Sequence, residues 1–500
     1  MEVKPQPCTN NWRNIIPPEG IIKYKQMIDG WYRTWQEYVP SCYDGSVPVP
    51  LVITVAGAAH HNADKYTAWP MIAERENFIV LYPHCLIEGI KYNLWRDYDG
   101  DGDMPDDIAY FDALIEMMKE KYNIDDERIY MQGQSNGDMM TSTYIFERGY
   151  KLAAAAPLNG PAGAYRFVSP ETGEIIRAPE YELPIIRCHG SEDVGGPMGK
   201  RSGKTSVIVP EVERHITEEE RANKFRAHQM IHLYLWRETN RCTSLPKLSM
   251  RGRYSWLHYE GDPCDLIYYI VEKGEHGPYH DMADYIWTYF FSGYKRVNGK
   301  IIRTEPNDKV EPDQGTIALA DGASKAYIDN KLVDMDEEGR KTRLIDGVYY
   351  VPVRFLEKAF QVTVEMYHDE EAAVISWGPN QLQLAMGNRA VVLNNRLRDI
   401  NRTLYFDNSL YVPISDLAEL MFGLKSAAGR GACYISQHGG EMSFDFAYII
   451  RELLGTEKIY TPLDCYNLEV SLIKELDLEQ DEARFREYMK RYKAENGIDL

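Results

Sequence analysis

Residues 133–137 read Gly-Gln-Ser-Asn-Gly, which matches the Gly-x-Ser-x-Gly pattern of a nucleophilic serine. A serine hydroxyl needs a base within hydrogen-bond reach, a carboxylate that orients this base, and N–H donors for the developing oxyanion. The strand-like "RIYMQ" precedes the pattern and the helix-like "MMTSTYIFE" follows it. This context predicts that Ser135 projects from a tight strand-to-helix turn, although an ordinary turn serine would fit the five residues alone.

The carboxylate of such a site follows the serine in the chain. Asp193 comes just after the apolar run "LPIIRCHG", and loops at the carboxyl ends of parallel strands carry the functional groups of such sheets. Asp193 is therefore a candidate to orient the base, and only the family resemblance described below favours it over its neighbour. Glu192 is the competing carboxylate, and Asp193 could instead cap a turn.

The base should follow the last strand of the sheet. His276 comes directly after "LIYYIVEKGE" and before the helical "MADYIWTYFF", which makes it the candidate base. His258 and His280 are alternative candidates for the base, and His232 is a less well placed one. His276 and His280 form an HxxxH pair, but the Glu of a zinc-binding HExxH motif is missing.

The oxyanion needs two backbone N–H donors. One should be the N–H of Asn136, the residue after the nucleophile. The second should come from the loop after an early strand, and "LVITVAGAAHH" ends a strand in Gly57-Ala58. The N–H of Ala58 is the candidate there.

Other residues of this chain could bind metal or form a disulfide. Asp97, Asp99, Asp101 and Asp103 have calcium-loop spacing, but Ile108 stands where a bidentate Glu is needed, so an acidic loop before a helix N-terminus is the simpler interpretation. Cys242 and Cys264 could form a disulfide or remain free thiols. We expect no metal ion and no cofactor in the site.

The apolar patterns predict an α/β fold with a doubly wound, mostly parallel sheet. Six near-continuously apolar runs alternate with helical patterns between about 48 and 292, as expected for strands covered on both faces. In the predicted helix of residues 105–125, six apolar side chains recur at helical spacing: Ile108, Phe111, Leu114, Ile115, Met118 and Tyr122. Residues 1–47 should add antiparallel edge strands.

Changes in composition divide the chain. We expect a catalytic domain at 1–295 with a lid-like insertion at about 195–260, a linker rich in Pro, Gly and charge at 296–316, an accessory domain at 317–437 and a solvated helical segment at 438–500.

Trp236 and Trp256 of the insertion could line a substrate site or pack in a core. "YYVPVRFLEKAF" at 349–360 and "LYVPISDLAELM" at 410–421 form a weak repeat, which predicts two strand–turn–helix units in a small α+β module.

The 500 residues carry a formal net charge of −20, which disfavours nucleic acid and anionic membranes as partners. No apolar run has the length of a membrane span, so we expect none. The N-terminus lacks the apolar core of a signal peptide. We therefore expect either a cytoplasmic protein or an exported one whose signal peptide has been removed.

Several stretches together resemble the polyhydroxybutyrate depolymerase and feruloyl esterase group of α/β-hydrolases. They cover about 35–295 and include "VPLVITVAGAAHHNADKY", "DDIAYFDALIEMMKEKYNIDDERIYMQGQSNGDMM", "LPIIRCHGSED" and "EKGEHGPYHDMADYIWTYFF". The resemblance implies an α/β-hydrolase fold with Ser135, Asp193 and His276 as the catalytic triad. Three places depart from the group's pattern: Ala56 stands where His is usual, Asp138 where Gly is usual, and the segment after Asp193 is rich in glycine.

The 317–437 region is similar to copper amine oxidase N-terminal-like domains, which implies a stalk or surface-attached accessory module and an exported protein. We expect a serine carboxylesterase that acts through an acyl-enzyme on feruloyl or acetyl esters of plant polysaccharide or on short polyesters. A peptidase of the prolyl oligopeptidase-like type and a decayed binding module are the alternatives.

Overall fold

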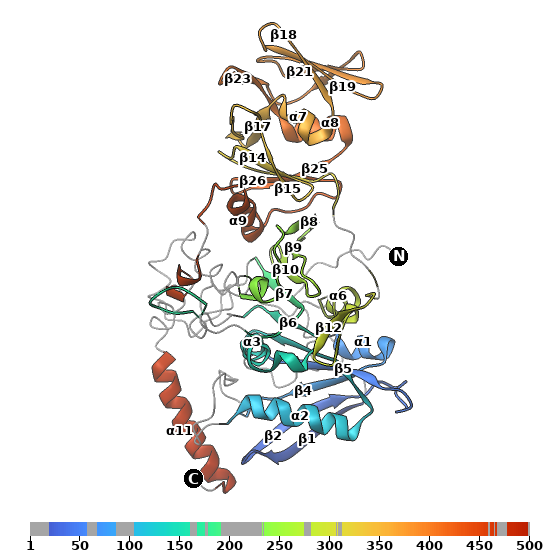
Figure 1. The fold of residues 1–500 in the computed structure, drawn as a ribbon, viewed down its shortest axis with the longest axis vertical. Coiled ribbons are helices and arrows are strands. Elements are labelled where there is room, and N and C mark those ends of the chain that lie inside the picture. Colours follow the sequence, from blue (N-terminus) through green and yellow to red (C-terminus); the bar gives the residue numbers. More distant parts are fainter. Residues whose placement is uncertain are drawn as a thin grey trace.

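The computed structural model describes residues 20–57, 68–86, 105–160, 168–175, 179–191, 233, 235–274, 282–306, 308, 313–458, 461–464, 466–467 and 478–498. Figure 1 shows an elongated molecule with a large sheet in its lower part and a smaller β-rich region above it. The helix α9 (Phe444–Leu453) lies between the two.

The large sheet has ten strands in the order β1-β2-β4-β3-β5-β6-β7-β10-β9-β8. The six strands from β4 to β10 run parallel, as the alternating pattern predicts. Antiparallel strands flank them at both ends, and β1 and β2 confirm the prediction of N-terminal edge strands. The bounds are β1 Ile21–Ile28, β2 Trp31–Tyr38, β3 Val49–Val55, β4 Ile79–Pro83, β5 Ile124–Gln134, β6 Ala154–Leu158, β7 Ile185–Gly190, β8 Lys247–Arg251, β9 Tyr254–Tyr259 and β10 Leu266–Val271.

Helices cover both faces of this sheet, so its strands are buried on both sides. The helices α2 (Asp107–Lys121) and α3 (Asn136–Arg148) pack on one face, and α1 (Trp69–Glu76) and α6 (Met282–Tyr289) pack on the other. Two short 3₁₀ helices, η3 (Gly149–Lys151) and η5 (Phe291–Gly293), follow α3 and α6. In α2 five of the six predicted apolar residues are buried, whereas Tyr122 follows the end of the helix and is half-buried. Asp106 caps the helix by accepting a hydrogen bond from the Ala109 N–H at 2.9 Å. The architecture is that of an α/β-hydrolase.

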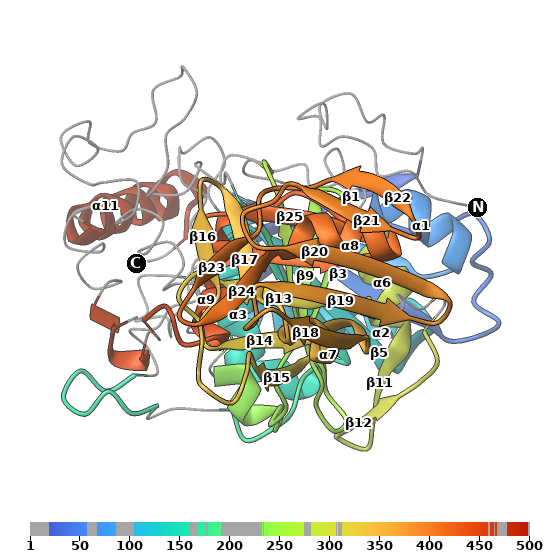
Figure 2. The same cartoon turned by 90° about the horizontal axis from the view of Figure 1, so that it is seen from above.

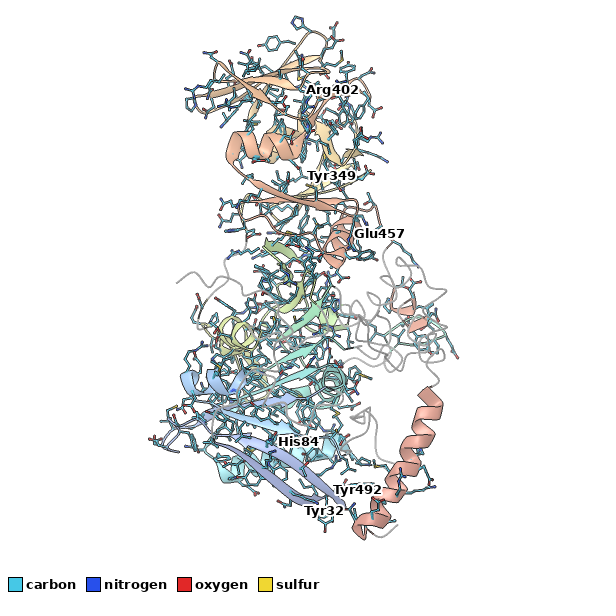
Figure 3. All side chains as sticks on the ribbon, turned by 180° about the vertical axis from the view of Figure 1, so that it is seen from behind. Tyr32, His84, Tyr349, Arg402, Glu457 and Tyr492 are labelled. Atoms are coloured by element: carbon cyan, nitrogen blue, oxygen red, sulfur yellow. The ribbon has the colours of Figure 1, made fainter. Side chains whose placement is uncertain are left out.

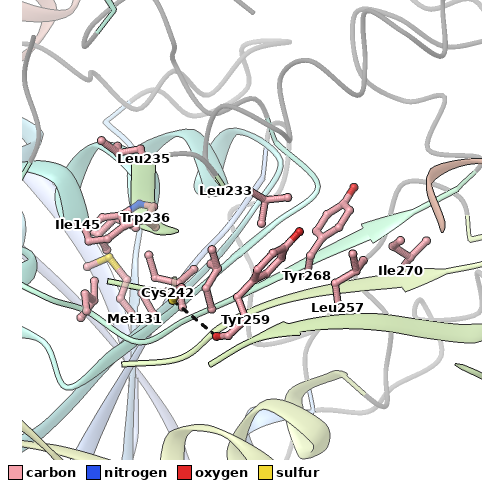
Figure 4. Close-up of a cluster of buried hydrophobic side chains, with 14 of the residues drawn as sticks. Met131, Ile145, Leu233, Leu235, Trp236, Cys242, Leu257, Tyr259, Tyr268 and Ile270 are labelled. Atoms are coloured by element: carbon pink, nitrogen blue, oxygen red, sulfur yellow. Dashed lines mark hydrogen bonds between the residues drawn. The ribbon is translucent and has the colours of Figure 1, made fainter. Parts of the chain in front are cut away.

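The described end of the 195–260 insertion forms strands rather than a lid. The strands β8 and β9 continue the sheet beyond β10, because each pairs antiparallel with its neighbour along its whole length. Trp236 is 1 % exposed and Trp256 is 7 % exposed, so both tryptophans pack in the core instead of lining a substrate site. Figure 4 shows Trp236 between Ile145 and Leu235 in this core.

Cys242 and Cys264 are free thiols in the structure. The Cys242 Sγ lies 3.7 Å from the carbonyl oxygen of Cys264 and 3.7 Å from that of Tyr259, the second contact being the dashed line in Figure 4. Burial raises the pKa of the Cys242 thiol to about 11. Both cysteines therefore act as small apolar residues of the core.

The segment expected as a linker begins in folded structure. The strands β11 (Tyr294–Val297) and β12 (Lys300–Arg303) form an antiparallel hairpin on the domain of the large sheet. The Arg303 guanidinium and the Tyr294 hydroxyl both bind the buried carboxylate of Asp265, at 2.8 Å and 2.9 Å. Some charges of the hairpin therefore pair with the large-sheet domain, although most of β12 is exposed to solvent.

Asp265→Asn is expected to lower the free energy of unfolding by about 2–3 kcal/mol at pH 7. Burial by itself would raise the pKa of Asp265, but hydrogen bonds and charge from His258 and Arg303 outweigh burial and hold this pKa well below its usual value. A lowered folded-state pKa stabilises the fold fully above the unfolded-state pKa of about 3.9, and this stabilisation is lost progressively as the pH falls from there through the folded-state pKa. Urea unfolding from pH 7 to pH 3 should show the difference in stability between the wild type and the variant narrowing below about pH 4. A difference that stays constant would contradict this assignment.

The upper region contains three antiparallel sheets (Figures 1 and 2). Its strands are β13 Ile317–Ala320, β14 Lys325–Ile328, β15 Lys331–Asp334, β16 Arg343–Ile345, β17 Val348–Pro352, β18 Thr363–Tyr367, β19 Ala372–Trp377, β20 Asn380–Ala385, β21 Ala390–Leu393, β22 Arg396–Asp399, β23 Leu404–Phe406, β24 Ser409–Pro413, β25 Lys425–Gly429 and β26 Ala432–Ser436. Its helices are α7 Phe355–Phe360 and α8 Ile414–Phe422.

The weak sequence repeat is present in this region. Each copy is a strand, a Val-Pro step and a helix, β17–α7 in the first and β24–α8 in the second. The two strands pair antiparallel with Val351 opposite Val412, so equivalent residues of the copies face each other. The repeat therefore folds as two units related by a local two-fold arrangement.

This region packs directly on the edge strand β8. The Tyr327 hydroxyl donates to the carbonyl of Pro246 at 2.8 Å, and the Tyr434 hydroxyl donates to the carbonyl of Leu248 at 3.0 Å. Asn330 accepts the Leu248 N–H at 2.9 Å. One apolar cluster joins Leu248 and Met250 to residues of β13 and β26. An otherwise open sheet edge is thus covered, and the two regions share a core.

The C-terminal helices are less solvated than their charge suggests. The helix α9 (Phe444–Leu453) buries Phe446, Tyr448 and Ile450 in the shared core. The helix α11 (Leu478–Asn496) lies beside β2: the Tyr492 ring is 6.2 Å from that of Trp31, and its hydroxyl donates to the carbonyl of Tyr32 at 3.3 Å. Figure 3 shows Tyr32 and Tyr492 side by side. The segment 438–500, which was expected to be solvated, therefore packs in part against the rest of the protein. Among the described helices, none has the length and apolar character of a membrane span.

Candidate active site

The turn at Ser135 joins the carboxyl end of β5 to the N-terminus of α3. Ser135 has φ 58° and ψ −118°, a conformation that side-chain-bearing residues rarely adopt. Its N–H donates to the carbonyl of Leu158 on β6 at 2.9 Å, and its carbonyl accepts from the Met139 N–H at 3.1 Å. Ser135 is partly exposed although its neighbours on β5 are buried. The structure thus confirms a strained strand-to-helix turn that presents the serine, which is the geometry expected of a nucleophile.

The two flanking glycines are required by close backbone contacts. A Cβ atom on Gly133 would lie 2.1 Å from the carbonyl oxygen of Gly137, and one on Gly137 would lie 2.2 Å from the carbonyl oxygen of Val55. Both distances are far inside van der Waals contact, so α3 reaches β5 and β3 this closely only without side chains at these positions. The spacing of the pentapeptide is therefore explained by packing as well as by chemistry.

The residues expected to supply oxyanion donors lie around the same turn. Asn136 is the first residue of α3, where backbone N–H groups point out of the helix. Gly57 follows the end of β3, and a Cβ atom built on it would lie 3.0 Å from the Ser135 Cβ. The segment that leads to Ala58 thus passes beside the serine, while Ala58 itself lies outside the described residues.

Asp138, which stands where the resembled group has glycine, forms a buried ion pair. Arg187 on β7 contacts it at 3.2 Å (Nη2 to Oδ2), and both side chains are 0 % exposed. Asp138 also accepts from the Ser142 hydroxyl at 2.8 Å and from the Gly160 N–H at 2.6 Å. Burial raises the pKa of Asp138 to about 6, and Arg187 with these donors opposes a larger rise.

This pair ties the first turn of α3 to β7 and to the backbone just after β6. Arg187 also donates to the carbonyl of Gly160, so one guanidinium holds both Asp138 and the backbone after β6. Sequence reasoning identified Asp138 as a departure but did not find its partner. A signal was available, because Arg187 stands inside the apolar run "LPIIRCHG", where a buried charge requires an opposite charge.

Asp193 and His276 lie outside the described residues. The strands that lead to them are neighbours in the sheet, since β7 and β10 pair in parallel with Gly190 opposite Val271. The last described residues before the two candidates are Ser191 and Gly274. The sheet order places β5, β6, β7 and β10 side by side with their carboxyl ends at one edge. The carboxylate and base assignments remain predictions that this topology permits.

His258 is not placed to serve as the base. It lies on β9 opposite Ile267, near the amino end of β10, and its Nε2 is 3.1 Å from the Asp265 carboxylate. Ser135 is at the carboxyl edge of the sheet instead. Of the other histidines considered, His232 and His280 lie outside the described residues, as do the acidic loop of Asp97–Asp103 and Glu192.

Two family models match the chain. Residues 36–160 match the family described as Esterase PHB depolymerase, and residues 327–425 match the family described as Copper amine oxidase N-terminal domain. Within the described residues, no group of three or more His, Cys, Asp or Glu side chains is placed to hold a metal ion.

Two curated proteins are similar to the esterase part. The bifunctional acetylxylan esterase/xylanase XynS20E of Neocallimastix patriciarum is 30 % identical over 158 residues, which cover 31 % of this chain and 21 % of that protein. The probable acetylxylan esterase A of Aspergillus terreus is 26 % identical over 162 residues, which cover 29 % of this chain and 51 % of that protein. The match therefore spans about a fifth of the length of the first relative and about half of the length of the second.

Solved structures were also matched, among them the acetyl xylan esterase from Aspergillus awamori, at 14 % identity and a TM-score of 0.38 over 54 % of this chain and 98 % of that one. A thermostable esterase is matched at 21 % identity and a TM-score of 0.27 over 35 % of this chain and 48 % of that one. The chain carries a domain of the PHB depolymerase esterase family, matched at 36–160, and a copper amine oxidase N-terminal domain, matched at 327–425.

Proposed function

We propose that the protein is a serine carboxylesterase with Ser135 as its nucleophile. The observation that carries the proposal is the strained turn at Ser135, which presents a partly exposed serine at the carboxyl edge of a parallel sheet. The esterase family match over 36–160 includes this turn and supports the same conclusion. No comparable observation supports a peptidase or a decayed binding module.

In the proposed mechanism each candidate takes the role that its place in the Ser, Asp, His order suggests. His276 removes the proton from the Ser135 hydroxyl, and Asp193 holds the imidazole in the required tautomer. Ser135 attacks the ester carbonyl, and the N–H groups of Ala58 and Asn136 stabilise the oxyanion. The alcohol leaves with a proton from His276. Water then attacks the acyl-enzyme with the same histidine as base, which releases the acid.

For the substrate we propose an acetyl or feruloyl ester on plant polysaccharide, with short polyhydroxyalkanoate-type esters as the next class. The two curated relatives are named acetylxylan esterases, which supports the acetyl ester first. We also propose a location outside the cell or at its surface, because such a location would suit a polymeric substrate. Initial rates on acetylated xylan, methyl ferulate and hydroxybutyrate oligomers would rank these classes.

A fluorophosphonate probe tests the serine mechanism. We expect one equivalent to label the wild-type protein, with the phosphonyl group on the peptide that contains Ser135, and no labelling of Ser135→Ala. A wild-type protein that resists the probe while a known serine esterase reacts would reject the enzyme assignment. Labelling that persists in Ser135→Ala would reject the assigned nucleophile.

A further inference from the structure

A short segment of the upper region reaches the strands that lead to the proposed acid and base. This segment, Gly440–Asp445, follows β26 and runs into the first turn of α9, and we call it the clasp. Its Gly440 forms a parallel bridge with Gly252, and the Glu441 N–H donates to the carbonyl of Gly252 at 2.8 Å. The clasp therefore runs alongside the β8–β9 turn at the edge of the catalytic sheet.

Two carboxylates of the clasp contact the strand ends beyond this turn. Asp445 Oδ2 lies 3.4 Å from His189 Nε2, and the two side chains are 8 % and 2 % exposed. Glu441 forms an ion pair with Lys273, and both side chains of this pair are about half exposed. His189 is the penultimate residue of β7, and Lys273 lies in the turn after β10.

These two strand ends also bind each other. The Ser191 N–H donates to the carbonyl of Val271 at 2.9 Å, and the Lys273 N–H donates to the Ser191 Oγ at 2.8 Å. Asp193 follows two residues after Ser191, and His276 follows two residues after Gly274. Whatever fixes this paired unit therefore fixes the start of both catalytic loops.

Asp445 is held more firmly than Glu441. It lies in the first turn of α9, which Ser443 caps by accepting the Phe446 N–H at 3.0 Å. The Ser443 side chain is buried, and Phe446 and Ala447 pack in the core that joins the two regions. An exposed pair such as Lys273–Glu441 contributes little stability, whereas the buried Asp445 cannot move without displacing α9.

We propose that the clasp positions the acid and base loops of the esterase site, with Asp445 acting through His189 as the main positioning residue. The upper region would then be an internal part of the catalytic unit, in contrast to a stalk that only attaches it to a surface. This inference rests on the proposed function, since it concerns the loops of Asp193 and His276.

The test compares Asp445→Ala with Tyr327→Phe in the full-length protein. Tyr327→Phe removes a buried hydrogen bond between the same two regions at Pro246, without touching β7 or β10. For p-nitrophenyl acetate we expect Asp445→Ala to lower kcat by about 10- to 100-fold, because small displacements of catalytic groups have effects of this size. KM should stay within about twofold, and Tyr327→Phe should keep the wild-type kcat. Asp445→Asn, which keeps the size and one oxygen, should recover most of the loss.

The possible outcomes separate the clasp from the proposed function. A kcat of Asp445→Ala equal to that of Tyr327→Phe, at a temperature where thermal unfolding shows both to be folded, would overturn the positioning role. A loss expressed in KM alone would overturn it as well. Failure of the wild-type protein to hydrolyse the ester or to react with the fluorophosphonate would instead reject the esterase assignment.

Discussion

Ser135→Ala is expected to lower kcat for p-nitrophenyl acetate by at least about 10⁴-fold, because the acyl-enzyme route is lost with the hydroxyl. The free energy of unfolding should change little. Alanine keeps the Cβ atom, so the strained backbone at φ 58° is the same in both proteins. Steady-state kinetics and urea unfolding of the purified proteins measure the two quantities.

Ser142→Ala is the matched control for this loss. Ser142 lies on the same helix and donates to Asp138, away from the turn. Its removal should cost about 1 kcal/mol of stability and leave kcat within about threefold at 25 °C. A Ser135→Ala protein with more than a tenth of the wild-type kcat would show that another group performs the attack.

Asp138→Ala is expected to lower the free energy of unfolding by about 3–5 kcal/mol at pH 8, where the wild-type carboxyl with its pKa of about 6 is ionised. The variant leaves the Arg187 guanidinium, which is 0 % exposed, without its carboxylate. It also removes the acceptor of the Gly160 N–H. Chemical denaturation at pH 8 measures the loss, and the variant should unfold at a clearly lower urea concentration.

A second substitution distinguishes an unpaired charge from a loss of packing. Asp138→Ala with Arg187→Met removes both charges, and much of the lost stability should return, because replacing a buried ion pair by apolar groups is often neutral. The inferred role would be contradicted if Asp138→Ala were as stable as the wild type, or if the double variant were less stable than Asp138→Ala. The ion pair would then not hold the first turn of α3 in place.

The features that sequence predicted are those with a local pattern. Near-continuous apolar runs predicted the strands β3, β4, β5, β6, β7 and β10, and helical spacing of apolar residues predicted α2. The turn at Ser135 was predicted because its two glycines and its flanking elements are all within a few residues. The repeat of the upper region was found for the same reason, since each copy carries its own Val-Pro step.

The features that sequence missed depend on partners far apart in the chain. Asp138 and Arg187 are 49 residues apart, and the spacing of neither residue indicates the other. The strands β8 and β9 were taken for a lid because their polar neighbours dominate the composition of the insertion. Arg303 and Asp313 were taken for linker charges, yet Asp313 is 4 % exposed and accepts the Met250 N–H at 2.9 Å. Composition describes how polar a segment is, and a polar segment can still be buried when its charges find partners.

The most direct test of the serine mechanism is the identity of the covalent intermediate. The protein is mixed with excess p-nitrophenyl acetate, quenched in acid within the first turnover, digested and analysed by mass spectrometry. We predict a burst of p-nitrophenol close to one equivalent per protein and an acetyl group on Ser135. A linear release of p-nitrophenol with no acetylated peptide, or an acetyl group on any other residue during turnover, would contradict it.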